Sequence, residues 1–161
     1  QNPERALTVD GMNASAYPIL LVEDSPADVK ILQRGLAEAG RAVELIVLRD
    51  GQEAADYLLR RGPFAKVSSW RRPDLIVLDL NLPRLTGLEV LRLLRSTPQF
   101  ALTPVVVLST SRRPEDVRDA YAAGANTYIE KPLDFARFVN ILRTLSELWL
   151  EMAVLPPTPP G

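Results

Sequence analysis

The stretch DLIVLDLNLP, residues 74–83, decides the fold of this chain. Residues 75–78 form an apolar run of the length expected for a strand that is buried on both faces of a sheet. Asp79 ends the run, and the residues that follow it include apolar Leu80 and Leu82. A carboxylate in such surroundings is costly unless nearby groups stabilise it. The stretch therefore predicts a buried parallel strand that ends in a functional acid.

Apolar runs of strand length alternate with segments of helical period along the middle of the chain. Strands are predicted at residues 18–22, 43–48, 75–78, 105–108 and 127–129. Helices are predicted at residues 26–39, 51–60, 87–96, 114–123 and 134–152. Because each strand needs a crossover to reach a parallel neighbour, the alternation predicts an α/β fold, a doubly wound five-stranded parallel sheet with five helices.

The composition excludes several classes of function. The 161 residues, 47% of them hydrophobic, suffice for one substantial core and predict one domain. A formal net charge of -1 gives no general attraction to nucleic acid or to an anionic membrane, so neither is expected as a partner. The absence of cysteine and histidine excludes disulfides, catalysis by thiol or imidazole, and metal sites built on these ligands.

The two ends of the chain differ from its middle. Residues 1–16 show no period and are expected to be disordered or to include foreign residues ahead of a natural start at Met12. Residues 17–152 are the predicted domain, and residues 153–161 are a proline-rich tail that we expect to be poorly ordered. The chain has no apolar run near the roughly 18 residues that span a bilayer, and no leader, so we expect a soluble, cytoplasmic protein.

Polar side chains stand at the ends of four predicted strands. They are Glu23 and Asp24 after the first strand, Asp79 after the third, Ser109 after the fourth and Lys131 after the fifth. Ligands of doubly wound sheets bind beyond the carboxyl ends of the strands, and the common strand order 2-1-3-4-5 brings these five residues into one volume. Alone, Asp24 is explained as a helix cap, Ser109 as a strand end and Lys131 as part of a turn. Their convergence favours a site.

The three acids of this set predict a metal ion. Carboxylates that lie close together repel one another, and a bound cation relieves the repulsion. Ligands that are all oxygen favour a hard ion, and a site open to water suits Mg²⁺ better than Ca²⁺. Asp24 and Asp79 are the predicted direct ligands, Glu23 binds directly or through water, and the backbone carbonyl of Asn81 completes the protein's share.

The remaining groups match phosphoryl transfer. A carboxylate can attack phosphorus, while a metal ion, an ammonium and a hydroxyl neutralise the oxygens of the transferring group. Asp79 is then the predicted phosphoryl acceptor. Lys131 would pair with one phosphoryl oxygen, and Ser109 would donate a hydrogen bond to another.

The same residues resemble the receiver domain of two-component response regulators. The resemblance covers residues 17–152 and rests on residues in the family's order and spacing: Glu23, Asp24, the acceptor in DLNLP at 79–83, Gly87, Ser109 and Lys131-Pro132. It implies a flavodoxin-like fold and Mg²⁺-dependent transfer to Asp79 from the phosphohistidine of a sensor histidine kinase. In this family the peptide bond at the position of Lys131-Pro132 is often cis, a conformation that only the proline makes accessible.

The resemblance further implies a switch. Phosphorylation of Asp79 would draw Ser109 toward it, and Tyr128 would rotate into the space that is vacated. The signalling face would consist of the helix opened by Pro114, the strand at residues 127–129 and the last helix. That helix has more apolar positions than one buried face requires, which favours a homodimer or a partner surface on this face and on the extended helix.

Two segments that a minimal receiver domain lacks indicate which members of the family this chain resembles most. Residues 61–72 form a long link into the third strand, and the last helix is extended, as in the single-domain regulators paired with bacterial phytochrome histidine kinases. Two alternatives are a degenerate receiver that acts only as a scaffold and a phosphatase with an aspartate nucleophile. The phosphatase motif has a second Asp where this chain has Asn81. We therefore expect a signalling protein that is no enzyme beyond its own phosphorylation and dephosphorylation.

Overall fold

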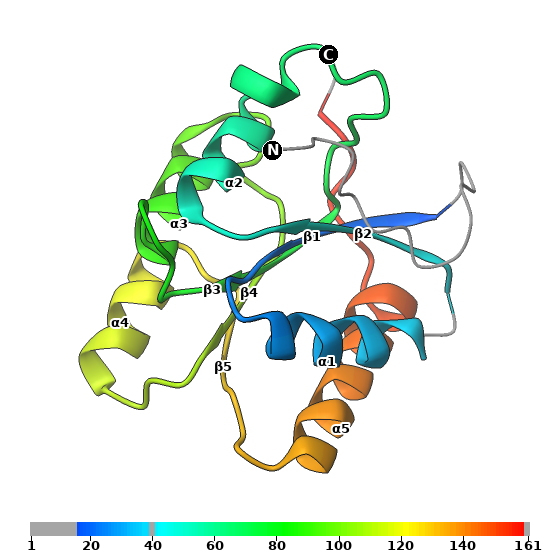
Figure 1. The fold of residues 1–161 in the computed structure, drawn as a ribbon, viewed down its shortest axis with the longest axis vertical. Helices are drawn as coiled ribbons and strands as arrows, with labels where there is room; N and C mark the ends of the chain where they lie inside the picture. The colour runs from blue at the N-terminus through cyan, green and yellow to red at the C-terminus, as the bar shows by residue number, and fades with distance from the viewer. Residues whose placement is uncertain (1–15, 39–40, 160–161) are drawn as a thin grey trace.

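The structure is a computed structural model, and it describes residues 16–38 and 41–159. Five parallel strands form one sheet in the order β2-β1-β3-β4-β5 (Figure 1). The strands are β1 (Tyr17–Val22), β2 (Val43–Leu48), β3 (Leu75–Asp79), β4 (Val105–Ser109) and β5 (Thr127–Glu130). The helices are α1 (Pro26–Ala37), α2 (Gly51–Leu58), α3 (Gly87–Ser96), α4 (Pro114–Ala122) and α5 (Phe135–Ser146), with a 3-10 turn at Gly62–Phe64 and a π-helical turn at Glu147–Met152.

The predicted fold class and strand order are confirmed. Three strands extend one residue further than predicted at their carboxyl ends, so that Asp79 and Ser109 belong to β3 and β4 themselves. The predicted end of the first helix at residue 39 lies outside the described residues, as do residues 1–15 of the expected N-terminal segment. The expected cis bond before Pro132 is wrong, since the peptide bonds that the structure describes are all trans.

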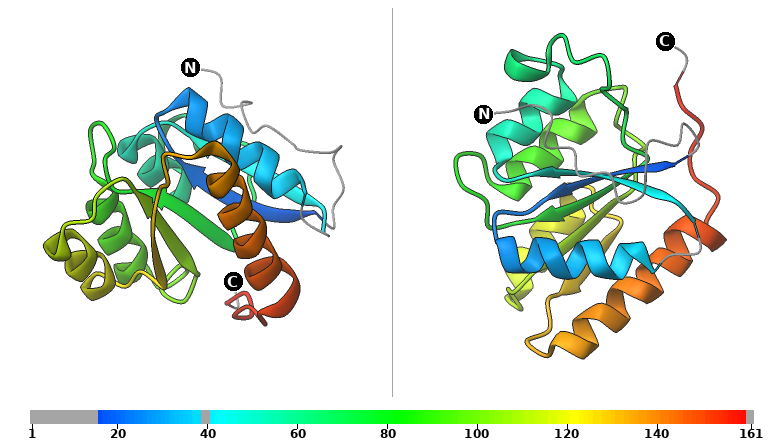
Figure 2. Two further views of the ribbon diagram at one scale, coloured as in Figure 1. Left: turned by 90° about the horizontal axis from the view of Figure 1, so that it is seen from below. Right: turned by 45° about the vertical axis from the view of Figure 1, so that its right-hand side comes forward.

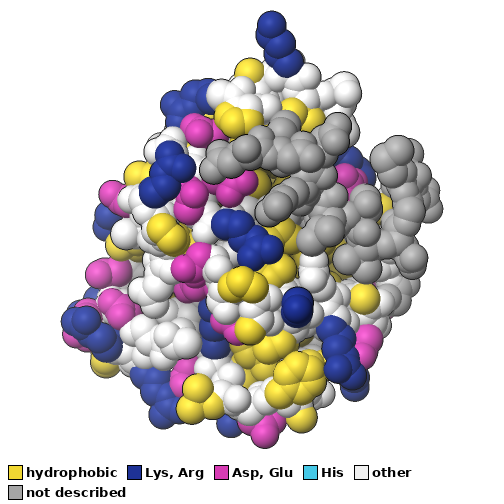
Figure 3. All heavy atoms as spheres, viewed as in Figure 1, with side chains coloured by type: hydrophobic (Ala, Val, Ile, Leu, Met, Phe, Trp, Pro, Cys, Tyr) yellow, Lys and Arg dark blue, Asp and Glu magenta, His cyan; other side chains and the backbone are white. Residues whose placement is uncertain are grey.

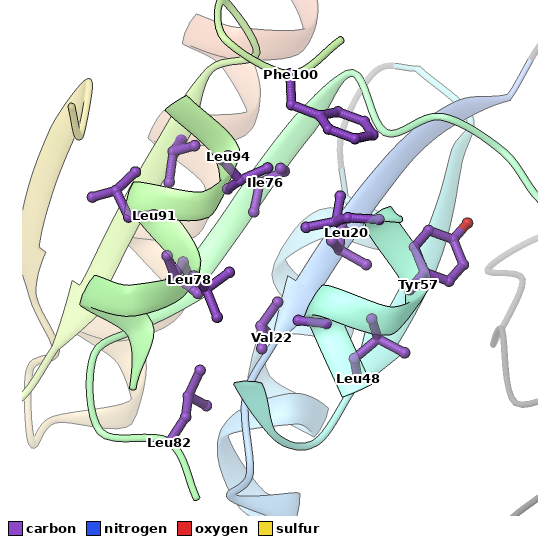
Figure 4. Packing of buried hydrophobic residues seen from close by; sticks show 14 of the residues in the cluster. Leu20, Val22, Leu48, Tyr57, Ile76, Leu78, Leu82, Leu91, Leu94 and Phe100 are labelled. Carbon is purple, nitrogen blue, oxygen red and sulfur yellow. The ribbon is translucent and has the colours of Figure 1, made fainter. Parts of the chain in front are cut away.

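The helices cover the two faces of the sheet in two groups (Figure 2). Leu20, Ile76 and Leu78 of the strands point toward α2 and α3, where they pack with Leu91 and other apolar residues (Figure 4). On the opposite face α1 and α5 lie side by side and cover a second apolar layer. Since burial of apolar area is the main favourable term in folding, these two layers hold the central strands in place.

Two features explain why α1 and α3 begin where they do. Ser25 caps α1 by accepting a hydrogen bond from the backbone N–H of Asp28, with Pro26 in the first turn. Thr86 and Glu89 form a capping box at the start of α3. The two helices begin next to the carboxyl ends of β1 and β3.

The extended last helix is not one regular α-helix. Phe138, Leu142, Ser146 and Leu150 are all buried, at a constant spacing of four residues. An α-helix with 3.6 residues per turn would rotate such a series away from the sheet. The π-helical turn at Glu147–Met152 is wider, and it brings Leu150 back onto the apolar layer.

The link between α2 and β3 is an ordered part of the fold. Trp70 stacks on Tyr57 of α2 with ring centroids 5.6 Å apart, and its Nε1 donates a hydrogen bond to the carbonyl oxygen of Tyr57 at 2.8 Å. The guanidinium of Arg71 pairs with Glu44 of β2 at 2.5 Å, so this arginine contributes to the fold. In the described part of the chain, no helix is both long and apolar enough to cross a membrane.

The loop after β3 folds tightly over the start of α3 at Gly87. A Cβ atom at this position would lie 2.1 Å from the carbonyl oxygen of Asp79 and 2.7 Å from the Cα of Leu80. The backbone N–H of Gly87 also donates a hydrogen bond to the carbonyl oxygen of Leu80 at 3.0 Å. This close approach explains why glycine stands eight residues after Asp79.

We predict that Gly87→Ala destabilises the protein by about 1–3 kcal/mol, because the added methyl group meets rigid backbone and the loop must move. Urea denaturation monitored by circular dichroism measures the change. The matched control is Arg92→Ala on an exposed position of the same helix, which should stay within about 0.5 kcal/mol of the parent. Equal stability of Gly87→Ala and the parent would contradict the close approach.

Candidate phosphoacceptor site

Four strands deliver polar groups to one edge of the sheet. Glu23 directly follows β1, Asp79 ends β3, Ser109 ends β4 and Lys131 directly follows β5. These strands are neighbours in the order β1-β3-β4-β5, so their carboxyl ends meet at the same edge (Figure 1). All four residues are buried. Burial of so many polar groups at one place requires that they stabilise one another.

Lys131 holds this edge together. Its ammonium Nζ lies 2.7 Å from Glu23 Oε2, 3.0 Å from Asp28 Oδ2 and 3.2 Å from Asp79 Oδ2. The lysine side chain is only 6% exposed. An ammonium has three N–H groups, and here each has a carboxylate partner.

The carboxylate of Asp28 is the member of the cluster that the sequence analysis missed. It comes from the first turn of α1, four residues after Asp24. An acid in the first turn of a helix is common because it interacts favourably with the helix dipole. The sequence therefore gave no reason to distinguish Asp28 from an acid that only stabilises its own helix.

Burial and charge shift the ionisation of this cluster. Burial raises the pKa of Glu23 to about 7, while the hydrogen bond from Lys131 opposes this shift. Burial lowers the pKa of Lys131, but the hydrogen bond to Glu23 and the charges of Asp79 and Glu23 outweigh it, so the lysine pKa lies above its usual value. Because three carboxylates surround it, Lys131 stays an ammonium, and Glu23 takes up a proton more readily than an ordinary glutamate.

The acids Glu23, Asp24 and Asp79 can meet at one point. Each offers a carboxylate oxygen, and these oxygens lie within 4.8 Å of one another. Asp24 is exposed, whereas the other two acids are buried, so the cluster opens to solvent on one side. A donor set made only of oxygen with an open side fits a hard divalent cation that keeps some of its water.

Asn81 lies beside this cluster. It is exposed, and its backbone N–H donates a hydrogen bond to Asp79 Oδ1 at 3.1 Å. The two oxygens of Asp79 are thus oriented from two directions, since Oδ2 faces Lys131 and Oδ1 faces Asn81. Metal binding by the carbonyl of Asn81 stays a prediction.

The two predicted switch residues are linked through Ser111. The hydroxyl of Ser109 accepts a hydrogen bond from the backbone N–H of Ser111 at 3.1 Å. The hydroxyl of Tyr128 donates to the carbonyl oxygen of Ser111 at 2.9 Å. Ser109 is fully buried and Tyr128 is half-buried. A displacement of the β4–α4 loop would therefore affect both residues.

The fold and the site together define a class of protein: a doubly wound α/β domain with an oriented aspartate, an open acidic cluster and a buried ammonium at the carboxyl edge of its sheet. The chain belongs to the response regulator receiver domain family, whose model matches residues 19–143. The polar groups described above all lie within the matched residues.

Known proteins support this assignment along most of the chain. The chain is 39% identical to response regulator Rcp1 of Synechocystis over 138 residues, which cover 86% of this chain and 92% of Rcp1. The solved structure of the phosphorylated cyanobacterial phytochrome response regulator RcpA matches with a TM-score of 0.82 at 42% identity, covering 88% of this chain and 99% of RcpA. The Mn²⁺-bound form of Rcp1 matches with a TM-score of 0.82 at 38% identity and the same coverage.

We predict that a divalent cation stabilises the protein, because it binds the folded acidic cluster more tightly than the unfolded chain. Without metal, Asp24→Asn should raise the melting temperature by less than about 2 °C, because Asp24 is exposed and water screens its repulsion from Glu23 and Asp79. The same change should reduce the further rise caused by Mg²⁺. Differential scanning calorimetry with EDTA and with a Mg²⁺ series measures both effects.

The matched control for this prediction is Asp119→Asn, which removes one charge from an exposed position of α4. It should leave the response to Mg²⁺ unchanged. A response to Mg²⁺ that is equal in the parent and in Asp24→Asn would place the cation elsewhere.

Proposed function

We propose that this chain is a response regulator whose Asp79 accepts a phosphoryl group from the phosphohistidine of a sensor histidine kinase. The observation that carries the proposal is the placement of Asp79, a buried acid at the end of β3 with one oxygen facing the Lys131 ammonium. It stands beside an acidic cluster that is open to solvent. Few structural roles require a carboxylate to be oriented in this way beside an open site.

The transfer is a displacement at phosphorus. A carboxylate oxygen of Asp79 forms a bond to phosphorus while the bond between phosphorus and the histidine nitrogen breaks. The nitrogen keeps the electron pair, and the imidazole that leaves becomes neutral or takes a proton from water. Lys131 donates a hydrogen bond to a phosphoryl oxygen, and Ser109 donates to another after its hydroxyl turns toward Asp79.

We propose Mg²⁺ as the cofactor, held by Glu23, Asp24, Asp79 and the carbonyl of Asn81. When bound, the ion neutralises the negative charge that the phosphoryl group brings to the acidic cluster. The oxygen-only donor set and its open side support this choice. The Mn²⁺-bound structure of Rcp1 shows that a relative holds a divalent cation.

The two alternative functions have less support. A scaffold that is never phosphorylated has no use for the oriented Asp79 or for the acidic cluster. A phosphatase would need an acid two residues after its nucleophile, and Asn81 offers an amide there. We therefore propose a signalling protein that does not turn over a separate substrate. The receiver domain that carries this function consists of residues 17–152.

We propose a bacterial phytochrome as the partner kinase. RcpA, which matches almost along its full length, is a phytochrome response regulator. The prediction of a phytochrome kinase rests on two additions, the link that precedes β3 and the extended last helix. Both are ordered parts of the fold. A partner of this kind contacts the regulator only transiently, so the recognition surface stays exposed in the free protein.

The proposed output is a change in the face formed by α4, β5 and α5. A phosphoryl group on Asp79 attracts the hydroxyl of Ser109, and movement of this oxygen toward Asp79 would lengthen the hydrogen bond that it accepts from the N–H of Ser111. Tyr128 is held by the same residue, so its position is expected to change as well. The hydrogen bond from the N–H of Tyr128 to the hydroxyl of Tyr121 extends this connection to α4.

We further propose a homodimer on this face and on the extended last helix. Apolar side chains gather where α1 and α5 lie in the view of Figure 3. Beyond α5, Leu148 is 45% and Met152 is 71% exposed, whereas Leu150 between them is buried. The π-helical turn therefore presents two large apolar side chains to solvent, and a second copy would cover them.

We predict that incubation with acetyl phosphate and Mg²⁺ adds the mass of one phosphoryl group, which intact-mass spectrometry detects. The Asp79 oxygen displaces acetate, which leaves with the electron pair of the broken bond to phosphorus. Asp79→Asn should abolish the added mass, because an amide oxygen is a poor nucleophile, and the control Asp119→Asn should retain it. No added mass on the parent would favour the scaffold, and release of phosphate without retained mass would favour the phosphatase.

We predict that Leu148→Lys weakens self-association at least about tenfold, because a charge replaces an apolar contact in the proposed dimer. Size-exclusion chromatography with light scattering, with and without beryllofluoride, measures the mass in solution. The control is Leu102→Lys, an exposed leucine that precedes β4 and lies outside α4, β5, α5 and the π-helical turn. A monomer under both conditions would rule out the dimer.

A further inference from the structure

The ion pair between Asp28 and Lys131 has no part in the proposed transfer. Glu23 and Asp79, the other two partners of Lys131, belong to the acidic cluster that would bind metal and accept the phosphoryl group. Asp28 stands outside that cluster, on the first turn of α1. Its bond to Lys131 at 3.0 Å is nevertheless as short as an ordinary charged hydrogen bond.

The ammonium of Lys131 has no N–H group to spare. Its three hydrogens face three carboxylates, at 2.7, 3.0 and 3.2 Å. An incoming phosphoryl oxygen must therefore replace or weaken one of these bonds. The carboxylates also reduce the attraction that the lysine can exert on a new anion, because the cluster of four acids and one lysine is net negative.

Asp28 is the partner that can be given up at the least cost. Its side chain is 27% exposed, whereas those of Glu23 and Asp79 are 2% and 7% exposed. A carboxylate that water can reach regains hydration when its partner leaves, and a buried one does not.

We propose that Asp28 is a positioning residue that competes with the phosphoryl group for Lys131 and thereby limits how readily Asp79 is phosphorylated. The inference rests on the proposed function and deepens it. In the free protein Asp28 holds the ammonium toward α1. In the phosphorylated protein the ammonium turns to a phosphoryl oxygen, and Asp28 faces water.

The experiment measures binding of beryllofluoride, which adds to an aspartate as an analogue of the phosphoryl group. At saturating Mg²⁺, ¹⁹F NMR counts the bound species in the parent and in Asp28→Asn. The variant should bind beryllofluoride about three- to tenfold more tightly, the range expected when one competing charged hydrogen bond of a partly exposed acid is removed. Asparagine keeps the backbone N–H that Ser25 caps, so α1 should stay intact.

Two controls separate competition from other effects. Glu130 is next to Lys131 in the sequence, but its carboxylate pairs with Arg112 and not with the lysine. Glu130→Gln therefore removes one negative charge near Lys131 and should leave beryllofluoride affinity nearly unchanged. Asp28→Glu restores a carboxylate that can reach Lys131 and should return the affinity toward that of the parent. If Asp28→Asn is too unstable to test, Asp28→Ser serves in its place with the same expected gain.

The outcomes distinguish this inference from the proposed function. Absence of beryllofluoride binding to the parent would overturn the proposed function, and the inference with it. Binding to the parent combined with equal or weaker binding to Asp28→Asn would overturn the inference alone. An equal gain in Glu130→Gln would also overturn it, because the effect would then be one of general charge.

Discussion

The contact of one buried ammonium with three carboxylates is the interaction on which this site depends. Lys131 follows the edge strand β5, yet its Nζ reaches an acid just after β1, one in α1 and one at the end of β3. The lysine thus ties the edge of the sheet to its centre. Removing one partner of a buried ion pair typically costs about 3–5 kcal/mol, because the other charge stays buried without compensation. The acids of this edge therefore require the lysine, as the lysine requires them.

The rest of the fold supplies the rigidity that this arrangement needs. Apolar layers on both faces fix the strands, and the strands end at positions from which Asp79 and Ser109 enter the site. Gly87 lets α3 begin against the backbone of Asp79. This rigid arrangement also gathers like charges, and the Lys131 ammonium offsets part of their repulsion. We propose that a phosphoryl charge on Asp79 disturbs this balance.

A small number of hydrogen bonds connects the phosphoacceptor site to the face formed by α4 and β5. Ser111 is hydrogen-bonded to both Ser109 and Tyr128, and its own hydroxyl donates to Asp116 of α4 at 2.5 Å. One loop therefore links the carboxyl edge of the sheet to β5 and α4. A change in the charge of Asp79 has a short path to the face that we propose for output.

Much of the architecture could be predicted because it follows from local pattern. The alternation of buried runs and amphipathic segments determined the class of fold and the order of its elements, and the predicted helices begin within one residue of where the structure has them. The last helix was harder, because the wide turn at Glu147–Met152 depends on the position of the sheet that Leu150 must reach. The trans bond before Pro132 was also missed, since the sequence allows either isomer.

By itself, the sequence determined which chemical groups stand at the carboxyl ends of the strands, since a strand end is visible in the pattern of apolar residues. Glu23, Asp79 and Lys131 were predicted to meet, and the structure brings them together. Only the tertiary structure decided that Asp28 joins them. Its distance from Lys131 depends on how α1 packs beside the sheet, and a separation of 103 residues along the chain carries no information about a contact of 3.0 Å.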